Sequence, residues 1–286
     1  MRTALADKPM LRFDAPRLIG PVPQAGRTIE AVESHGKHLE VHWDDGLVLD
    51  THMRMTGSWH LYRKGDPWRR PYAQMRAAIE VSDWVAVCFN APHVETYRQR
   101  DWRRHPGAGR LGPDLCQPDT DLGHVVNLLL TYPEPEERVS TVLLDQRVMC
   151  GVGNVYRCEV LWATELSPFA RVGDLGEHDA IRIVNTAASM LRANLSRADR
   201  VTLPPSPGNH RGSLAVYGRN GQRCHRCAGS IECRRMGEHQ RVVYWCPGCQ
   251  THLDPRLMRS RDDTPMDPHP AAQRWLSELP WNRDVG

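Results

Sequence analysis

Four cysteines are the residues whose types and spacing point most directly to chemistry. They form two Cys-x-x-Cys pairs separated by 18 residues: Cys224, Cys227, Cys246 and Cys249. Each short pair can bring two thiolates to one ion, and two such pairs complete the tetrahedral coordination of Zn²⁺. Four thiolates leave no open coordination position. We therefore predict one structural Zn²⁺ that holds a β-hairpin in place.

The segment that carries these cysteines is strongly basic. Residues 211–241 contain seven arginines and two acidic residues, a local net charge of +5. The planar arginine side chain suits phosphate oxygens, so the hairpin is a candidate nucleic-acid contact. Two other interpretations stay open, a zinc ribbon with a solvated basic face and a zinc ribbon that docks on a protein. Residues 54–110, with a local charge of +6, form a second basic run that would attract polyanions.

Length and composition set wider limits. The chain has 286 residues, of which 40% are hydrophobic, and a net charge of +3. It has no apolar run long enough for a membrane span, and its first residues lack the apolar segment of a secretory signal. The other five cysteines are scattered, as is typical where thiols stay reduced. We expect a cytoplasmic monomer.

Residue patterns predict an α+β multidomain fold. Alternating segments at residues 37–43, 47–52 and 84–89 indicate short antiparallel strands of a β-sandwich. Helical spacing of apolar residues follows from about residue 119. The predicted domains are an N-terminal β-sandwich over 1–110, a helical domain over 111–205, a zinc-finger β-hairpin over 206–250 and a flexible tail over 251–286.

A glycine-rich turn lies inside the predicted helical domain. Gly151 and Gly153 interrupt an apolar helical pattern, and Asn154 follows at a position typical of a helix N-cap. Free amides at such a helix start can hold a phosphate. Most turns of this kind only join two helices, so the pattern alone is weak.

Four separate stretches resemble one protein family. Residues 143–157, followed by Glu159-Val-Leu-Trp, resemble the helix-two-turn-helix of the formamidopyrimidine-DNA glycosylase and endonuclease VIII family. Ser34-His-Gly-Lys-His-Leu resembles its lysine hairpin, His52-Met-Arg-Met-Thr-Gly-Ser its intercalation loop, and Tyr244-Trp-Cys-Pro-Gly-Cys-Gln its zinc finger. The resemblance covers about residues 5–250, and the last stretch is most similar to the endonuclease VIII branch.

The resemblance implies a base-excision repair enzyme. Such a protein would be a DNA glycosylase that removes oxidised bases and an abasic-site lyase that cleaves the strand by β,δ-elimination. Its partner would be double-stranded DNA with a damaged base or an abasic site. A base inside a duplex must be flipped out before it can be excised, and a side chain then fills the gap.

The resemblance also implies roles for individual residues. Lys37 and Arg241 match catalytic positions, linked to β-elimination and δ-elimination respectively. Met55 matches the wedge, and Arg54 beside it would contact the unpaired opposite base. Arg110 and Asn154 match positions that contact the DNA backbone. Without the resemblance, Lys37 and Arg110 would be interpreted as ordinary surface residues.

The family's nucleophile has no counterpart in the given sequence. The resemblance implies an N-terminal proline amine that forms a Schiff base, followed by a glutamate as general acid and base. The sequence begins Met1-Arg-Thr-Ala-Leu, which resembles a later part of the family's first helix. Two interpretations stay open, a longer natural protein that is a glycosylase and lyase, or a shortened relative that binds damaged DNA without cutting it. The chain as written is expected to form no Schiff base.

Overall fold

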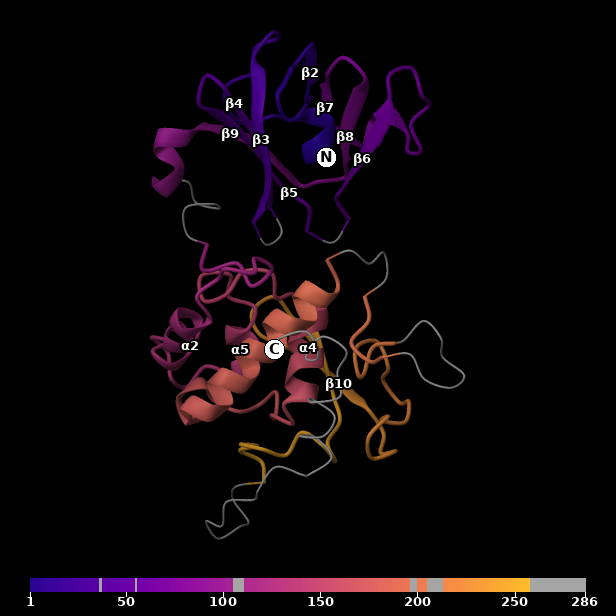
Figure 1. Ribbon diagram of the computed structural model, residues 1–286. Helices are drawn as coiled ribbons and strands as arrows, with labels where there is room; N and C mark the ends of the chain where they lie inside the picture. The colour runs from indigo at the N-terminus through magenta and orange to yellow at the C-terminus, as the bar shows by residue number, and fades with distance from the viewer. Residues whose placement is uncertain (36–37, 55, 105–110, 196–199, 205–212, 258–286) are drawn as a thin grey trace. The chain divides into compact units, whose positions relative to one another are not determined.

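The computed structural model describes residues 1–257 apart from 36–37, 55, 105–110, 196–199 and 205–212. The chain divides into two compact units, Met1–Leu111 and Gly112–Gly286 (Figure 1). A search of the described residues finds no helix with the length and apolar character needed to span a lipid bilayer.

The first unit is a sandwich of two antiparallel sheets (Figure 1). The strand order is β1-β3-β4-β5-β9 in the larger sheet and β2-β7-β8-β6 in the smaller one. The strands are β1 (Lys8–Pro9), β2 (Arg12–Asp14), β3 (Thr28–His35), β4 (His38–Trp43), β5 (Leu47–His52), β6 (Ser58–Arg63), β7 (Met75–Glu80), β8 (Trp84–Phe89) and β9 (His93–Arg98). A short helix α1 (Arg2–Leu5) precedes them. The 3-10 helix η1 (Tyr72–Gln74) comes directly before β7, and the 3-10 helix η2 (Gln99–Arg104) follows β9.

Alternation along the strands builds the core between the sheets. On β4, Val41 and Trp43 are buried in that core. Successive side chains of a strand point to opposite faces, so Glu40 and His42 lie on the other face of the same sheet. The predicted strands over 47–52 and 84–89 coincide with β5 and β8, and the sandwich is confirmed.

The second unit is helical. Its helices are α2 (Leu122–Leu130), α3 (Val139–Val142), α4 (Asn154–Ala163) and α5 (Glu177–Ala193), with the 3-10 helix η4 (Val172–Asp174) before α5. The helix before the glycine turn is shorter than the sequence pattern predicts, because residues 143–150 form turns. Asp145 explains this: its carboxylate accepts the backbone N–H of Arg147 at 2.9 Å, a local bond that competes with helix formation.

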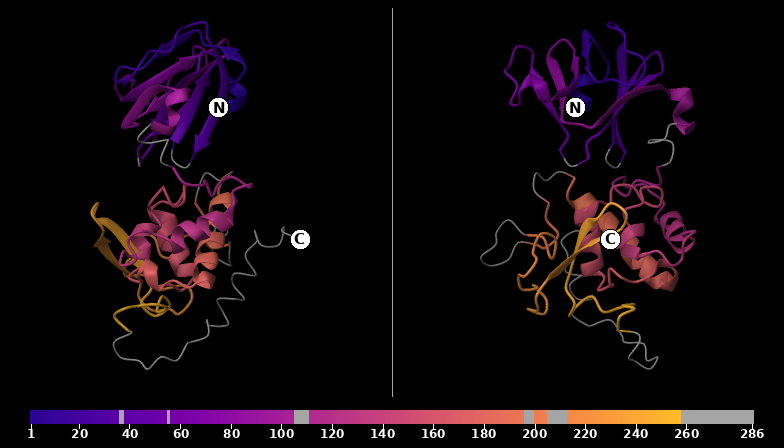
Figure 2. Two further views of the ribbon diagram at one scale, coloured as in Figure 1. Left: turned by 90° about the vertical axis from the view of Figure 1, so that its left-hand side faces the viewer. Right: turned by 180° about the vertical axis from the view of Figure 1, so that it is seen from behind.

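The predicted hairpin is present between the two cysteine pairs. Strands β10 (Glu232–Met236) and β11 (Arg241–Trp245) pair antiparallel, with Arg234 opposite Val243 at the centre. The hairpin lies against α4, as the view from behind in Figure 2 shows.

The start of the predicted flexible tail is packed. Gln250, the residue directly before the predicted tail, has a buried side chain that donates to the Leu166 carbonyl at 3.1 Å. His252 Nε2 lies 2.9 Å from a carboxylate oxygen of Asp179, and the Arg256 guanidinium stacks 3.9 Å from the Phe169 ring. The prediction of a flexible tail is therefore wrong for residues 251–257. The rest of the predicted tail, 258–286, lies outside the described residues.

Candidate nucleic-acid interface

The four predicted cysteine ligands come together in the second unit. Their sulfur atoms all lie within 4.8 Å of one another. The Sγ atoms of Cys224 and Cys249 are 3.8 Å apart, and those of Cys227 and Cys246 are 3.4 Å apart. Tetrahedral coordination with metal–sulfur bonds of about 2.3 Å would place sulfurs about 3.8 Å apart. The cluster therefore fits a metal ion with four thiolate ligands.

The cluster is fastened to α4. Hydrogen bonds from the thiols of Cys246 and Cys249 hold the pKa of Cys224 far below its ordinary value. Trp162 of α4 donates its indole N–H to the same sulfur at 3.4 Å. Such an outer contact orients a ligand and favours the thiolate. This contact ties Cys224, and with it the first cysteine pair, to α4.

Basic side chains around the hairpin fall into two groups. Four arginines are exposed: Arg223, Arg234, Arg235 and Arg241. Two others are occupied within the fold. Arg226 donates to Glu165 at 2.9 Å and stacks on Trp162, and Arg219 donates to the Arg223 carbonyl at 2.7 Å. Arg211 lies outside the described residues. The exposed arginines form the part of the basic run that can meet phosphate.

Asn154 begins α4, but it does not cap the helix. Gly153 occupies the N-cap position and supplies no side chain. The Asn154 side chain instead donates to the Val242 carbonyl on β11 at 3.0 Å and accepts from Arg157. The predicted N-cap role is wrong, because both polar atoms of the amide are already engaged.

This contact brings two predicted site residues together. Asn154 bonds to Val242, and Val242 follows Arg241 at the start of β11. The two bonded residues are 88 positions apart in the sequence. The fold thus gathers one candidate DNA-contacting residue and one candidate catalytic residue at one place on the second unit.

Arg157 is a residue of this place that the sequence analysis did not assign. It is only 1% exposed, and its guanidinium donates to the Ser140 carbonyl at 3.2 Å and to the Val242 carbonyl at 3.3 Å. Burial lowers its pKa. The signal in the sequence that could have identified it is a charged residue inside the largely apolar run of residues 155–163.

Glu159 is a second residue for which the sequence analysis predicted no role. Its buried carboxylate accepts the backbone N–H groups of Ala215, Val216 and Tyr217 at 2.6, 2.9 and 2.8 Å, and the hydroxyl of Thr202. A carboxylate that meets three amides forms strong, charge-assisted hydrogen bonds. Glu159 therefore fixes the chain where it enters the segment that carries the two cysteine pairs, residues 224–249, which we call the cysteine module.

The glycine turn before α4 depends on Gly151. Its φ is +100°, in the region that favours glycine. A Cβ there would lie 3.1 Å from Leu191 Cδ1 and 3.4 Å from the Cys116 sulfur. The turn can therefore approach α5 closely only with glycine at this position.

In the first unit, the structure describes one of the four predicted site residues. Arg54 is exposed in the turn between β5 and β6 and adopts a left-handed backbone with φ of +45°. The Gly57 N–H closes this turn on the Met53 carbonyl at 2.8 Å. Lys37, Met55 and Arg110 lie outside the described residues.

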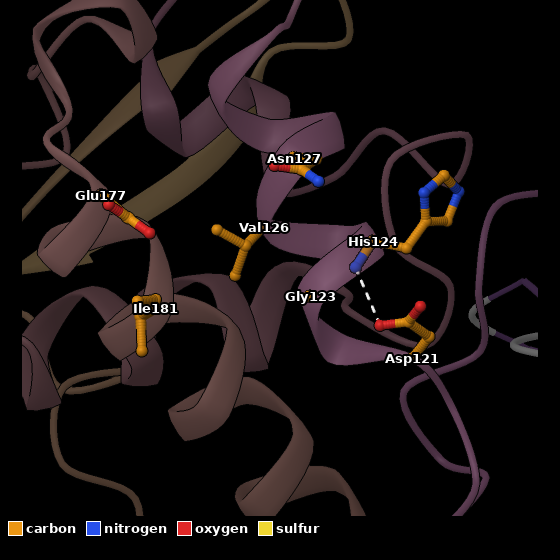
Figure 3. A pocket seen from close by; sticks show the side chains of 7 residues that line it. All are labelled: Asp121, Gly123, His124, Val126, Asn127, Glu177 and Ile181. Atoms are coloured by element: carbon orange, nitrogen blue, oxygen red, sulfur yellow. Dashed lines mark hydrogen bonds between the residues drawn. The ribbon is translucent and has the colours of Figure 1, made fainter.

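The second unit also has a surface hollow. It has a volume of about 500 Å³ and lies between α2 and the start of α5 (Figure 3). Its lining includes Asp121, whose carboxylate accepts the His124 backbone N–H at 3.0 Å and so caps α2. None of the predicted site residues lines it.

Comparison with known proteins agrees with this architecture. Residues 2–99 match the family model described as formamidopyrimidine-DNA glycosylase N-terminal domain, and residues 111–203 match that of the H2TH domain. A Streptomyces coelicolor protein named probable endonuclease 8 2 is 34% identical over 90% of this chain and 91% of its own length. A DNA-(apurinic or apyrimidinic site) lyase of Mycolicibacterium smegmatis is 36% identical over 88% and 94%.

Solved structures share the fold. Lactococcus lactis formamidopyrimidine-DNA glycosylase, non-covalently bound to DNA with an abasic site, superposes with a TM-score of 0.72. The sequence identity is 20%, and the match covers 87% of this chain and 95% of that one. The sandwich, the helical unit and the cysteine hairpin are thus those of a known architecture. The chain belongs to the formamidopyrimidine-DNA glycosylase and endonuclease VIII family.

Proposed function

We propose that this protein is a base-excision repair enzyme, a DNA glycosylase for oxidised bases with abasic-site lyase activity. The relatives named endonuclease 8 and abasic-site lyase, each aligned over most of its length, support this activity. The substrate is double-stranded DNA with a damaged base or an abasic site. Work on chromosomal DNA would place the protein in the cytoplasm, at the nucleoid, and we expect it to act as a monomer.

The observation that carries the proposal is the contact between α4 and β11. Asn154 at the helix start contacts a DNA phosphate through the second hydrogen of its amide nitrogen, since the first is donated to the Val242 carbonyl. Arg241 on the adjoining strand acts in δ-elimination. The hydrogen bond from Asn154 to the Val242 carbonyl supports this assignment, because it ties the start of α4 to the residue that follows Arg241 on β11. The exposed hairpin arginines supply further positive charge for the phosphate backbone.

The metal that fits the cysteine cluster is Zn²⁺. The sulfur separations and four thiolate ligands suit a closed structural zinc site. When bound, zinc supplies no reactive position, and it stabilises the hairpin. Its contribution to the reaction is the placement of Arg241.

Residues of the first unit complete the proposal. Arg54, exposed and held in a closed turn, contacts the base left unpaired after flipping. Met55 next to it is the wedge, Lys37 contacts the phosphate near the lesion and promotes β-elimination, and Arg110 contacts the DNA backbone. These assignments rest on the match of each residue to a position of known role in the family's sequence motifs.

The test is borohydride trapping of protein purified from its natural source on duplex DNA with one abasic site. N-terminal sequencing of the same sample identifies the amine available for attack. A trapped covalent complex together with strand cleavage supports the proposal. Salt-sensitive binding without trapping or cleavage would show instead a damaged-DNA-binding protein without lyase activity, and binding that does not respond to salt would remove DNA as the partner.

A further inference from the structure

The surface hollow of the second unit has no part in the proposed function, and its floor is apolar. Val126 of α2 and Ile181 of α5 lie on facing sides of it (Figure 3). Ile181 is 39% exposed, whereas most large apolar side chains of the helical unit are buried. A concave surface with an apolar floor and a few polar groups at its edge has the character of a binding site.

The rim of the hollow is acidic. Asp121 and Glu177 lie at the starts of α2 and α5, and no lysine or arginine lines the hollow. Asp121 accepts the His124 backbone N–H with one of its two carboxylate oxygens. Among the residues that the structure describes, the exposed Glu177 carboxylate has no hydrogen-bonding or ionic partner. Acidic residues suit helix starts, but that preference does not explain the apolar floor between them. The hollow is therefore complementary to an apolar segment with basic ends.

The chain itself contains such a segment. Residues 258–286 follow the described part of the chain, and all their tryptophans and leucines lie within a short stretch: Trp275, Leu276, Leu279 and Trp281. Arg274 and Arg283 flank this group, and with Glu278 between them the segment keeps a net positive charge. An apolar segment between two arginines matches an apolar floor between two carboxylates in both shape of pattern and sign of charge.

The packed start of the tail brings the chain to α5. His252 Nε2 lies 2.9 Å from Asp179, which stands between Glu177 and Ile181 in the sequence of that helix. Residues 258–273 connect the described chain to Arg274. A linker of this length has a root-mean-square span of about 20–24 Å, which exceeds the helix diameter of about 10–12 Å. The segment can therefore pass around α5 to the hollow, and such a tether gives it a local concentration on the order of millimolar.

We propose that residues 274–283 dock in the hollow between α2 and α5. The apolar side chains of the segment cover Val126 and Ile181, and its two arginines pair with Asp121 and Glu177. The docked segment holds the tail on the helical unit and stabilises the packing of α2 against α5. This contact lies within one chain and does not depend on the proposed DNA repair activity.

The test is hydrogen exchange of the full chain, with its cysteine site loaded with zinc and without DNA, measured by mass spectrometry of peptic peptides. Amides of a docked segment exchange more slowly than those of a free one. We expect residues 275–283 to exchange at least tenfold more slowly than a synthetic peptide of the same sequence. This protection should not change with protein concentration, because the segment and the hollow belong to the same chain.

Two pairs of variants identify the contact. Ile181→Lys places a positive charge on the floor and should remove the protection, whereas Leu195→Lys makes the same change at an exposed leucine beyond α5 and should keep it. Trp275→Ala should speed exchange at the starts of α2 and α5 at least threefold, and Met266→Ala in the same tail should not. Because Trp275 lies outside the helical core, its variant remains informative if Ile181→Lys does not fold.

The charge of the rim is tested separately. Glu177→Gln should speed exchange of residues 275–283 at least threefold. Glu134→Gln removes an exposed carboxylate beyond the end of α2 and should leave this rate unchanged.

Several results would overturn the proposal. These are exchange of residues 275–283 at the rate of the free peptide, equal protection in Ile181→Lys and Leu195→Lys, and equal effects of Trp275→Ala and Met266→Ala. Protection that rises with protein concentration would do so too, because it would make a second copy of the chain the occupant. None of these measurements involves DNA, so a failure here is distinguishable from a failure of the proposed function.

Discussion

Arg157 shows how one buried side chain can join distant parts of the second unit. It bonds to carbonyls of Ser140 and Val242 and to the Asn154 side chain. Without the guanidinium, the Ser140 carbonyl and the Asn154 side-chain oxygen would lose this partner, whereas the Val242 carbonyl would keep its hydrogen bond from Asn154. A buried unsatisfied group costs about 1–3 kcal/mol.

We therefore expect Arg157→Ala to lower the free energy of unfolding by about 2–4 kcal/mol. Urea denaturation followed by circular dichroism measures the change. Arg234→Ala is the matched control, because Arg234 is exposed on β10 and its loss should change stability by less than about 0.5 kcal/mol. Equal effects of the two substitutions would contradict the role assigned to Arg157.

His52 is a second residue with a measurable property of its own. Burial and the positive charge of nearby His38 lower its pKa to about 4, although Asp50 acts in the opposite direction. The His38 and His52 rings are stacked, with centroids 4.4 Å apart. The His52 imidazole should therefore be neutral at pH 7.

The lowered pKa of His52 makes the stability of the fold depend on pH. Between pH about 6.5 and about 4 the unfolded chain binds a proton at His52 and the folded chain does not, so stability is lost as the pH falls through this range. Nuclear magnetic resonance titration of the imidazole should give a pKa near 4 for His52. His38→Gln should raise that pKa toward 6.5, and an unchanged value would contradict the coupling of the two rings.

At the scale of elements, α4 and the hairpin form one assembly around the cysteine cluster. The Trp162 indole donates to Cys224, and the Tyr244 backbone N–H donates to the sulfur of Cys158, both at 3.4 Å. Changes at the metal should therefore reach the helix.

Removal of the metal tests this assembly. We expect Cys246→Ser to lose the bound metal and to shift the tryptophan fluorescence, because the environment of Trp162 changes. Cys233→Ser is the matched control, since Cys233 is exposed on β10 and lies outside the cluster. Metal content by atomic absorption should stay at one ion per chain in the control, and metal loss in both variants would point to a different ligand set.

At the scale of the whole molecule, DNA binding should depend on salt. Each phosphate contact that is lost reduces the slope of log affinity against log salt by about 1. We expect this reduction for Arg241→Gln on abasic duplex DNA, measured by fluorescence anisotropy. Arg171→Gln, which removes an exposed arginine paired with Glu136 at 2.8 Å, should leave the slope unchanged.

Local patterns in the sequence predicted the elements well, and contacts between distant elements poorly. The strands β5 and β8 and the cysteine cluster follow from alternation and spacing, which are local signals. The bond from Asn154 to Val242 joins residues 88 positions apart, so no local pattern contains it. Likewise, Glu33 meets Glu40 only because of the register of β3 and β4. The N-cap prediction for Asn154 failed for the same reason, since a partner on β11 engages its side chain.

The way α4 holds the cysteine module bears on how freely that module could be exchanged between relatives. Asn154, Arg157, Glu159 and Trp162 each bond to the module or to the segment that enters it. A transplanted module would meet four side chains selected for another partner. A functional chimera should therefore need the relative's residues at these four positions of α4 as well as its cysteine module.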